Sequence, residues 1–302
     1  MSTIHDLFSV NDYNSGLGLS SLHPLVSIVD LSKAVMPKRT DEYAVRYHFY
    51  GVFLKQGVNC VISYGRQNYD YQDGTLVFVG PDQVVNIKPL GKPEPMSGYA
   101  LLFHPDLLRG THLGNTIDDY SFFSYALHEA LHISQKERQI VLDCFEKIGD
   151  ELTERLDQHS KTVIVSTIEL FLNYCKRFYD RQFITRDSVN EGIVERFDSS
   201  LKSYIKSGQA KEEGIPSVSY FAEEQNLSAK YFGDLLKKET GKTAQEFIQL
   251  KLIDTAKNQF HDPEISISEI AYNLGFKYPQ HFTRLFKQQV GMSPKEYREM
   301  MN

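Results

Sequence analysis

Two segments near the end of the chain resemble each other, and this repeat constrains the fold more than any other feature. The first copy covers residues 217–248 and the second covers residues 266–298. Matching residues in the later part of each copy lie 50 positions apart: Phe232 and Phe282, Leu235 and Leu285, Lys237 and Lys287, Gly241 and Gly291. Ser217 and Ser266 lie 49 positions apart, so the second copy has one extra residue in its turn. The pattern predicts two copies of one supersecondary unit.

Each copy predicts two helices joined by a tight turn. In the second copy, Ser266 and Glu269 have the spacing of a capping box, which starts a helix. Gly275 ends that helix, because glycine accepts the left-handed backbone of a C-cap. Pro279 lies near the start of the next helix, where its missing N–H costs nothing. In the first copy, Ser228 caps the second helix. Two helices joined in this way predict a helix-turn-helix unit, whose second helix enters the major groove of DNA.

Polar residues remain outside the apolar face of the second helix of each copy. In the second copy they are Tyr278, Gln280, His281, Arg284 and Lys287, and in the first copy they include Lys230, Asp234 and Lys237. We expect Gln280 and His281 to read base edges. Arg284 and Lys287 would contact phosphate or guanine, while Lys230 and Lys237 would position the first unit. Residues 244–260 form one long helical pattern, so the two recognition helices would enter major-groove segments about 34 Å apart.

The pattern of the second copy is similar to a known family. The residues that carry the resemblance are Ile270-Ala271, Leu274-Gly275-Phe276, Phe282, Arg284, Phe286-Lys287, Gly291, Ser293-Pro294 and Tyr297-Arg298. They resemble the AraC-type family of bacterial transcription regulators, over about a third of the chain. The resemblance implies that residues 228–234 and 277–284 face bases and phosphates, which adds Ser228, Ala229 and Lys277 to the expected DNA contacts.

The first copy departs from the family pattern at two positions. Asp234 stands where the family usually carries a basic residue, matching Arg284 in the second copy. An acid there would repel phosphate but would be able to accept a hydrogen bond from a cytosine amino group. Gln225 stands where an apolar residue is common. These departures concern what the first helix contributes to DNA binding, and leave the expected fold unchanged.

The net charge of −6 is unusual for a protein that binds nucleic acid, but the distribution of charge matters more than its total. Residues 270–295 contain no acid, and they contain Lys277, Arg284, Lys287 and Lys295. One basic face on a mildly acidic chain predicts modest non-specific affinity for phosphate. Binding would then depend on base contacts and on dimerisation.

The region before the repeat changes character at Pro105. Residues from about 20 to 105 contain short runs of β-branched and aromatic residues broken by turn residues, which predicts a β-barrel or jelly roll. Residues 120–156 and 161–179 have helical periodicity. The family resemblance implies that this region is a cupin-like effector or dimerisation domain.

We therefore expect an α+β protein in three parts. Residues 1–182 would form a cupin-like β-barrel with a helical hairpin, and residues 183–194 a polar linker. Residues 195–302 would form an all-α domain of two helix-turn-helix units. The apolar stretch at residues 163–174 fits either a core helix or a helix that contacts a second subunit.

A small-molecule effector would meet aromatic side chains in the predicted barrel. Tyr47, His48 and Tyr50 are the candidates for binding it, with Tyr64 and Tyr71 in the same region. The alternative is that these side chains simply fill the interior of a small barrel. Both interpretations stay open.

Residues 128–132 match H-E-x-x-H, the pattern of zinc peptidases. On one helix, His128 and His132 would bind zinc and Glu129 would act as general base. Three fixed positions often match by chance, so we expect a helix with solvated histidine and glutamate side chains. A metal-dependent cupin enzyme would need clustered histidines, whereas His48 stands alone on its strand. We expect no catalytic residues, no metal and no cofactor.

The remaining features indicate a cytoplasmic protein. The three cysteines are scattered, which argues against a disulfide framework or a structural zinc site. The N-terminal residues lack the pattern of a signal peptide, and no stretch of about 18 apolar residues would span a membrane.

The favoured function is a sequence-specific transcription regulator that binds double-stranded DNA. Its expected partners are RNA polymerase, a second copy of the chain and a small-molecule effector. Two alternatives stay open: a metal-dependent enzyme, and a protein-interaction adaptor that has lost DNA binding.

Overall fold

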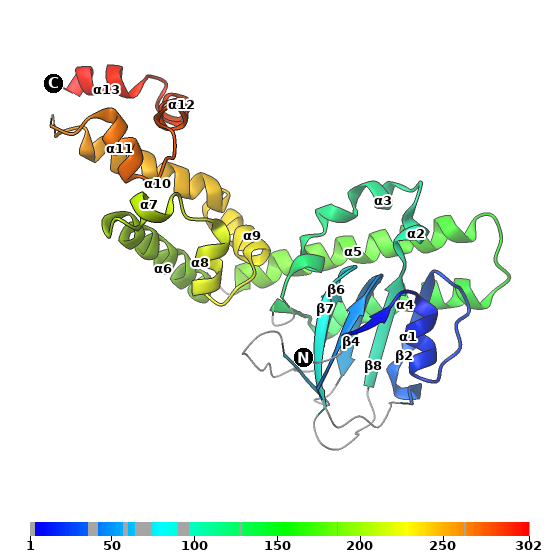
Figure 1. Cartoon of the computed structure of the whole chain (residues 1–302). Coiled ribbons are helices and arrows are strands. Elements are labelled where there is room, and N and C mark those ends of the chain that lie inside the picture. The colour runs from blue at the N-terminus through cyan, green and yellow to red at the C-terminus, as the bar shows by residue number, and fades with distance from the viewer. Residues whose placement is uncertain are drawn as a thin grey trace. The chain divides into compact units, whose positions relative to one another are not determined.

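The computed structural model describes residues 4–35, 42–56, 60–63, 74–89, 97–126, 129–185, 187–262 and 264–301. The chain divides into two compact units, Met1–Thr185 and Arg186–Asn302. Strands occur in the N-terminal unit, and the described part of the C-terminal unit is helical (Figure 1). The chain is therefore a mixed α+β protein, as expected.

The strands of the N-terminal unit pair into two sheets. The first has the order β1 (Ile4–Leu7), β3 (Tyr43–Tyr47), β7 (Val84–Pro89) and β5 (Cys60–Ser63). The second has the order β2 (Val26–Asp30), β8 (Ser97–Phe103), β4 (Tyr50–Gln56), β6 (Thr75–Val79) and β9 (Leu131–His132). β1 pairs parallel to β3, with Leu7 opposite Tyr47, and the other pairs are antiparallel. Among the described residues neither sheet closes into a ring, so the expected closed barrel is not confirmed.

The core of this unit lies between the two sheets. Alternate residues of a strand point to the same face of its sheet. Val77 and Val79 of β6, together with Leu102 of β8, belong to one buried cluster. The same cluster contains Val45 and Tyr47 of β3 in the other sheet. The two sheets therefore bury their apolar faces against each other.

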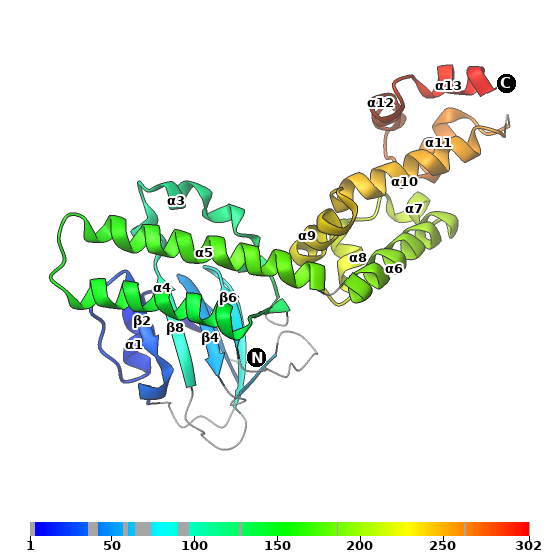
Figure 2. The same cartoon turned by 180° about the vertical axis from the view of Figure 1, so that it is seen from behind.

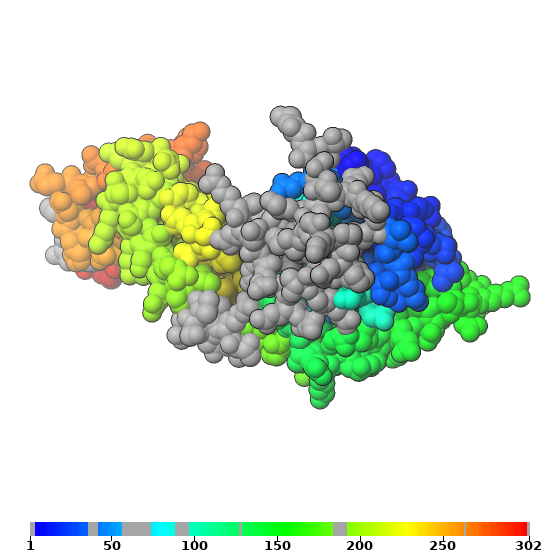
Figure 3. Space-filling model, turned by 90° about the horizontal axis from the view of Figure 1, so that it is seen from below, coloured from blue at the N-terminus to red at the C-terminus, as the bar shows by residue number. Residues whose placement is uncertain are grey.

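Helices cover the outer face of the five-stranded sheet. Phe78 of β6 packs its ring 4.4 Å from the ring of Phe122 and 6.0 Å from that of Tyr179, measured between centroids. Tyr179 lies on α5 (Ser160–Thr185), which packs against α4 (Gln135–Thr153) (Figure 2). β2 contacts α4, and Figure 3 shows the N-terminal segments (blue) adjoining the helical segments (green) on the surface of this unit. The shorter helices are α1 (Val10–Gly16), η1 (Leu31–Lys33), α2 (Pro105–Leu108) and α3 (His112–Thr116).

The helix expected over residues 120–156 begins later than predicted. The segment before it forms the 3-10 turns η2 (Ile117–Asp119) and η3 (Ser121–Ser124) and then strand β9. α4 starts at Gln135, where Ser134 and Glu137 form a capping box. Phe122 and Phe123 are buried, and an apolar pair in a turn has the same local signature as one in a helix. The prediction was therefore wrong for the first part of this range.

The described residues of the segment predicted as a polar linker are helical. α5 continues to Thr185, and α6 (Asp187–Lys206) starts two residues later. The polar side chain of Gln182 is buried on α5, where its oxygen accepts a hydrogen bond from the backbone N–H of His132 at 2.8 Å. This contact joins the last turns of α5 to strand β9.

The C-terminal unit contains both copies of the repeat. Its helices are α6, α7 (Gln209–Glu213), α8 (Val218–Glu224), α9 (Ala229–Thr240), α10 (Ala244–Gln259), α11 (Ile267–Asn273), α12 (Pro279–Val290) and α13 (Pro294–Met301). In the first copy, the ring of Phe197 on α6 lies 5.0 Å from that of Phe221 and 5.2 Å from that of Phe232. In the second, Phe260 after α10 lies 5.3 Å from Phe286. Each copy therefore packs its two helices against a third helix that precedes them.

Candidate nucleic-acid interface

The turn of the first copy joins α8 to α9. Asn226 has φ 56°, a left-handed conformation, and the N–H of Leu227 donates to the carbonyl of Ala222 at 2.9 Å. The hydroxyl of Ser228 accepts from the N–H of Tyr231 at 3.1 Å, which caps α9. The predicted turn and cap of the first copy are both confirmed.

The turn of the second copy joins α11 to α12 and is one residue longer. Gly275 has φ 88°, and the N–H of Phe276 donates to the carbonyl of Ala271 at 3.0 Å. Pro279 then occupies the first turn of α12. The two turns thus use the same pattern of backbone hydrogen bonds, and the predicted extra residue lies between Phe276 and α12.

The capping box predicted for α11 is present. The N–H of Ser266 donates to the carboxylate of Glu269 at 2.7 Å, and the Ser266 hydroxyl accepts from the Glu269 N–H at 3.1 Å. Hydrogen bonds from the side chain and the backbone of Ser266 lower the pKa of Glu269. This box fixes the start of the first helix in the second copy.

The predicted contact residues of the second copy share one solvent-exposed face. Those exposed in the structure are Lys277, Tyr278, Gln280, His281, Arg284 and Lys287. Phe282 and Phe286 point into the core from the other side of α12. The ring of Tyr278 lies 5.5 Å from that of His281, and the Lys277 ammonium lies 5.8 Å from the Tyr278 centroid. The start of α12 therefore presents basic and aromatic groups together, which suits contact with phosphate and sugar.

The corresponding residues of the first copy are less uniform. Ala229, Lys230 and Lys237 are exposed, whereas Ser228 is half-buried and caps the helix. Asp234 is also half-buried, one turn from Lys230 and Lys237. α9 thus carries two acids, Asp234 and Glu239, while α12 carries none. The described side chains of α12 are therefore more positive in total than those of α9.

Supporting contacts from α6 were not predicted from the sequence. Arg196 donates from Nε to the side-chain oxygen of Gln225 at 2.8 Å. The Ser200 hydroxyl donates to the carboxylate of Glu224 at 2.7 Å. Gln225, which departs from the family pattern, therefore has a hydrogen-bonding partner on α6 next to the turn. In the sequence, only the polar side chain of Gln225 at a commonly apolar position indicated that this residue has a hydrogen-bonding partner.

The signature residue Arg298 has a structural contact. Its Nη2 donates to the carbonyl oxygen of Ile265 at 2.8 Å, and its guanidinium carbon lies 5.3 Å from the centroid of Phe260. This contact fastens α13 to the segment before α11.

The structure does not bring the three candidate effector residues together. Tyr47 is buried in the cluster between the sheets, with its ring 5.6 Å from that of Phe49. Tyr50 stacks on Phe103 at 4.9 Å, on the helix-covered side of its sheet. Tyr64 and Tyr71 lie outside the described residues.

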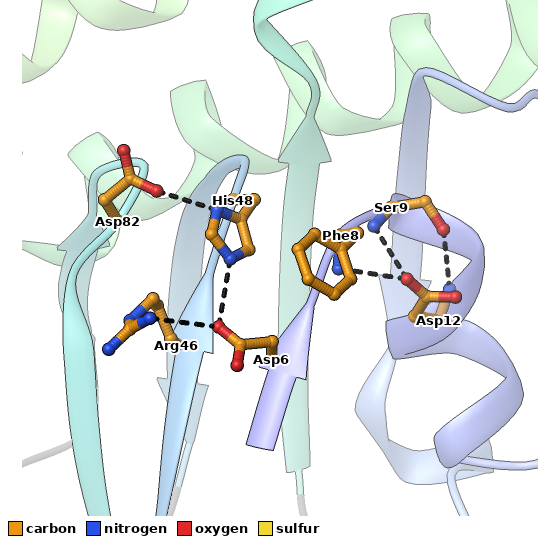
Figure 4. Close-up of polar contacts among 7 residues, drawn as sticks. All are labelled: Asp6, Phe8, Ser9, Asp12, Arg46, His48 and Asp82. Atoms are coloured by element: carbon orange, nitrogen blue, oxygen red, sulfur yellow. Dashed lines mark hydrogen bonds and ion pairs between the residues drawn. The ribbon is translucent and has the colours of Figure 1, made fainter. Parts of the chain in front are cut away.

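The third candidate, His48, lies in a cluster of charged residues (Figure 4). Its Nε2 lies 3.0 Å from Oδ1 of Asp6, and its Nδ1 lies 2.7 Å from Oδ1 of Asp82. Arg46 contacts the same Asp6 oxygen at 3.4 Å, and Phe8 stacks on the imidazole at 4.6 Å. These contacts fasten β1 beside β3, so His48 connects the N-terminal strand to the sheet.

The H-E-x-x-H segment does not form the helix that zinc peptidases require. His132 lies on strand β9, and the Glu129 carboxylate accepts from the backbone N–H of Ala126 at 2.6 Å. Glu129 is buried, which corrects the expectation of a solvated glutamate on a helix. His128 lies outside the described residues. A zinc peptidase of this type needs both histidines on one face of a helix. Among the described residues, His132 lies on a strand, so this requirement is not met.

Clusters of metal ligands and membrane-spanning helices are both absent from the described residues. No group of three or more histidine, cysteine, aspartate or glutamate residues in this part of the chain is arranged to hold a metal ion. None of the helices there is long and apolar enough to cross a membrane.

Comparisons with known proteins agree with this geometry. A family model described as a helix-turn-helix domain matches residues 221–300. An uncharacterised HTH-type transcriptional regulator, YfiF of Bacillus subtilis, is 29% identical over 49% of this chain and 43% of its own length. The HTH-type transcriptional activator RhaS of Salmonella arizonae is 32% identical over 38% of this chain and 41% of its own. The chain thus spans about two-fifths of the length of these curated relatives.

A solved structure also resembles the C-terminal unit. It is the C-terminal domain of the two-component response regulator yesN from Fusobacterium nucleatum, 29% identical, with a TM-score of 0.27. The match covers 32% of this chain and 96% of that one. On the match of the family model and the two curated relatives, residues 221–300 belong to the helix-turn-helix domain family, in its AraC-type form.

Proposed function

We propose that this chain is a transcription regulator that binds duplex DNA through α9 and α12. The observation that carries the proposal is the repeated turn, which in each copy places a capped helix with an exposed polar face after a short helix. Two such helices in one compact unit suit two segments of the major groove on one face of a duplex.

The exposed residues divide into two roles. Gln280 and His281 lie near the start of α12, where a recognition helix meets base edges. Arg284 and Lys287 lie further along the same exposed face and would contact guanine or phosphate. Tyr278 and Lys277 add phosphate and sugar contacts at the helix start.

On α9, Lys230 and Lys237 would contact DNA phosphates and so position the first helix-turn-helix copy on the duplex. Ser228 and Ala229 at the start of α9 would lie beside them. Asp234 would exclude a phosphate and favour a base that donates a hydrogen bond, such as cytosine. Affinity for DNA would therefore come mainly from α12, and α9 of the first copy would contribute selectivity for the base sequence.

The N-terminal unit would regulate this activity. Its two packed sheets and helical pair fit a cupin-like effector or dimerisation domain, and His48 is the one effector candidate whose ring lies in a polar cluster. A homodimer would double the DNA contacts, and RNA polymerase would be the partner at a promoter. A regulator of this kind works in the cytoplasm, where the bacterial chromosome lies.

The test is a selection of genomic DNA fragments with the purified full chain, followed by affinity measurements on the winners at several salt concentrations. The proposal expects a recovered site with two half-sites about one helical turn apart and an affinity that falls as salt rises. If no fragment is enriched, with or without cell extract as a source of effector, the adaptor interpretation takes its place.

A further inference from the structure

The same left-handed position of the two turns holds different residues. In the first copy it holds Asn226 at φ 56°, and in the second it holds Gly275 at φ 88°. Asparagine tolerates this conformation, so the backbone angle alone does not demand glycine at position 275. Asn226 is exposed, whereas the surroundings of Gly275 are crowded.

The crowding around Gly275 comes from the segment that follows α6. A Cβ placed on Gly275 would lie 2.7 Å from the carbonyl oxygen of Ala210 and 2.7 Å from the carbonyl carbon of Gly214. It would also lie 2.8 Å from the backbone nitrogen of Ile215. Real Cβ atoms essentially never approach other atoms within 3.0 Å, and all three neighbours are backbone atoms that cannot rotate away. The turn of the second copy therefore packs directly on the residue 210–215 segment.

That segment is itself anchored to the first copy. The Tyr204 hydroxyl on α6 donates to the carbonyl of Gly214 at 3.2 Å. The ring of Tyr204 lies 5.3 Å from that of Tyr220 on α8, and Ala210 is fully buried on α7. α7 contacts α11, and both views show α7 beside α10 (Figures 1 and 2). A chain of contacts thus runs from the first helix-turn-helix unit to the turn of the second.

We infer that Gly275 is a positioning residue that fixes the distance between the two recognition helices and thereby the half-site spacing that the protein accepts. This inference rests on the proposed function. α10 joins the two helix-turn-helix copies. A connection through this one helix alone would leave the copies free to rotate about the ends of α10. The contact between Gly275 and residues 210–215 supplies a second connection and removes that freedom.

The test compares Gly275→Asn with Gly291→Asn in the full chain. Gly291 has φ 86° and also ends a recognition-unit helix, but no atom lies within 4 Å of its Cβ position. Both variants therefore place asparagine at a position with positive φ. They differ in whether backbone atoms of other segments lie close to the new Cβ. Spin labels on an unnatural amino acid at positions 237 and 287 report the distance between α9 and α12 without DNA. We expect Gly275→Asn to shift or broaden the distance distribution, and Gly291→Asn to match the unsubstituted chain.

The DNA measurement uses the selected duplex and copies with one or two base pairs inserted between its half-sites. The unsubstituted chain and Gly291→Asn should discriminate against the insertions, and Gly275→Asn should lose about fivefold or more of that discrimination, the size of one lost base contact. If Gly275→Asn does not fold, Tyr204→Phe replaces it, since it keeps the ring but removes the hydroxyl that bonds Gly214 and Glu213. This change should also broaden the distances.

The outcomes separate the two proposals. An unchanged distance distribution in folded Gly275→Asn, or in Tyr204→Phe where that variant is used, overturns the role of Gly275 even if DNA binds. Absence of any selected duplex overturns the proposed function, while the label distances still decide whether the contact positions the helices.

Discussion

The carboxylate of Asp198 on α6 accepts a hydrogen bond from the ammonium of Lys251 on α10, 2.6 Å away. The contact joins the helix that supports the first copy to the helix that connects both copies. Burial opposes ionisation of this carboxyl, but hydrogen bonds from Lys202 and Lys251 lower the pKa of Asp198. The side chains of Lys251 and Asp198 are each three-quarters buried. Removing the Asp198 carboxylate would therefore leave the Lys251 ammonium poorly solvated and without this partner.

The first prediction is that Asp198→Ala destabilises the C-terminal unit by about 1–3 kcal/mol at neutral pH. The matched control is Asp254→Ala on α10, the helix that carries Lys251. This change removes an ion pair at the surface, in which Nζ of Lys257 lies 3.7 Å from Oδ1 of Asp254. That change should cost about 0.5 kcal/mol or less. Urea unfolding followed by circular dichroism measures both, and equal effects would show that the Asp198 contact has no special weight.

The second prediction concerns acid sensitivity. Hydrogen bonds within their capping boxes lower the pKa of Glu246, Glu269 and Glu296. A carboxyl with a lowered folded-state pKa stabilises the fold above its unfolded pKa of about 4.3 and loses that contribution as the pH falls further. Stability should therefore be flat near neutral pH and decline below about pH 4.3.

The variant that checks this replaces all three glutamates with glutamine, which also fits a capping box. The unfolding midpoint of the variant should depend less on pH below pH 4.3 than that of the unsubstituted chain. Parallel pH profiles for the two proteins would contradict the assignment of acid sensitivity to these caps.

The third prediction concerns the core of the first copy. Phe197 is fully buried, and its ring contacts those of Phe221, Phe232 and Phe247. Phe197→Ala should cost about 3–5 kcal/mol, because the cavity cannot collapse among rigid rings. The control Phe8→Ala removes a ring that is 64% exposed and should cost less than about 1 kcal/mol. Thermal unfolding measures both, and a small effect at Phe197 would mean that α6 does not support the first copy.

The fourth prediction concerns DNA affinity. Arg284→Ala should weaken binding to a selected duplex by about 1–3 kcal/mol, as loss of a base or phosphate contact does. Lys33→Ala removes the same charge from an exposed site in the N-terminal unit and should leave affinity unchanged. Fluorescence anisotropy titrations give both values. Equal losses in the two variants would indicate a response to net charge rather than a contact at Arg284.

The C-terminal unit could be predicted closely from the sequence because its signals are local. Ser266, Gly275 and Pro279 each act within a few residues, through caps and turn conformations that depend on residue type. The apolar spacing of α12 likewise determines which face is buried. The role of α6 was not visible, because the contact between Arg196 and Gln225 joins residues 29 positions apart.

The N-terminal unit was harder to predict because its pairings are long-range. Strands were expected between residues 20 and 105, but β1 pairs with β3 about 40 residues later, and β9 pairs with β6 about 56 residues earlier. Buried aromatic residues such as Phe122 and Phe123 resemble helix positions in sequence although they lie in a 3-10 turn. Local patterns do not distinguish two packed sheets from one closed barrel.

The most direct test of the central claim is photo-crosslinking from the two recognition helices to one selected duplex. A photoreactive amino acid replaces Lys230 on α9 in one protein and Gln280 on α12 in another. We predict crosslinks from both, to major-groove positions about one helical turn apart on the same duplex. Crosslinks from neither helix, or from both to the same base pairs, would contradict a protein that reads DNA through α9 and α12.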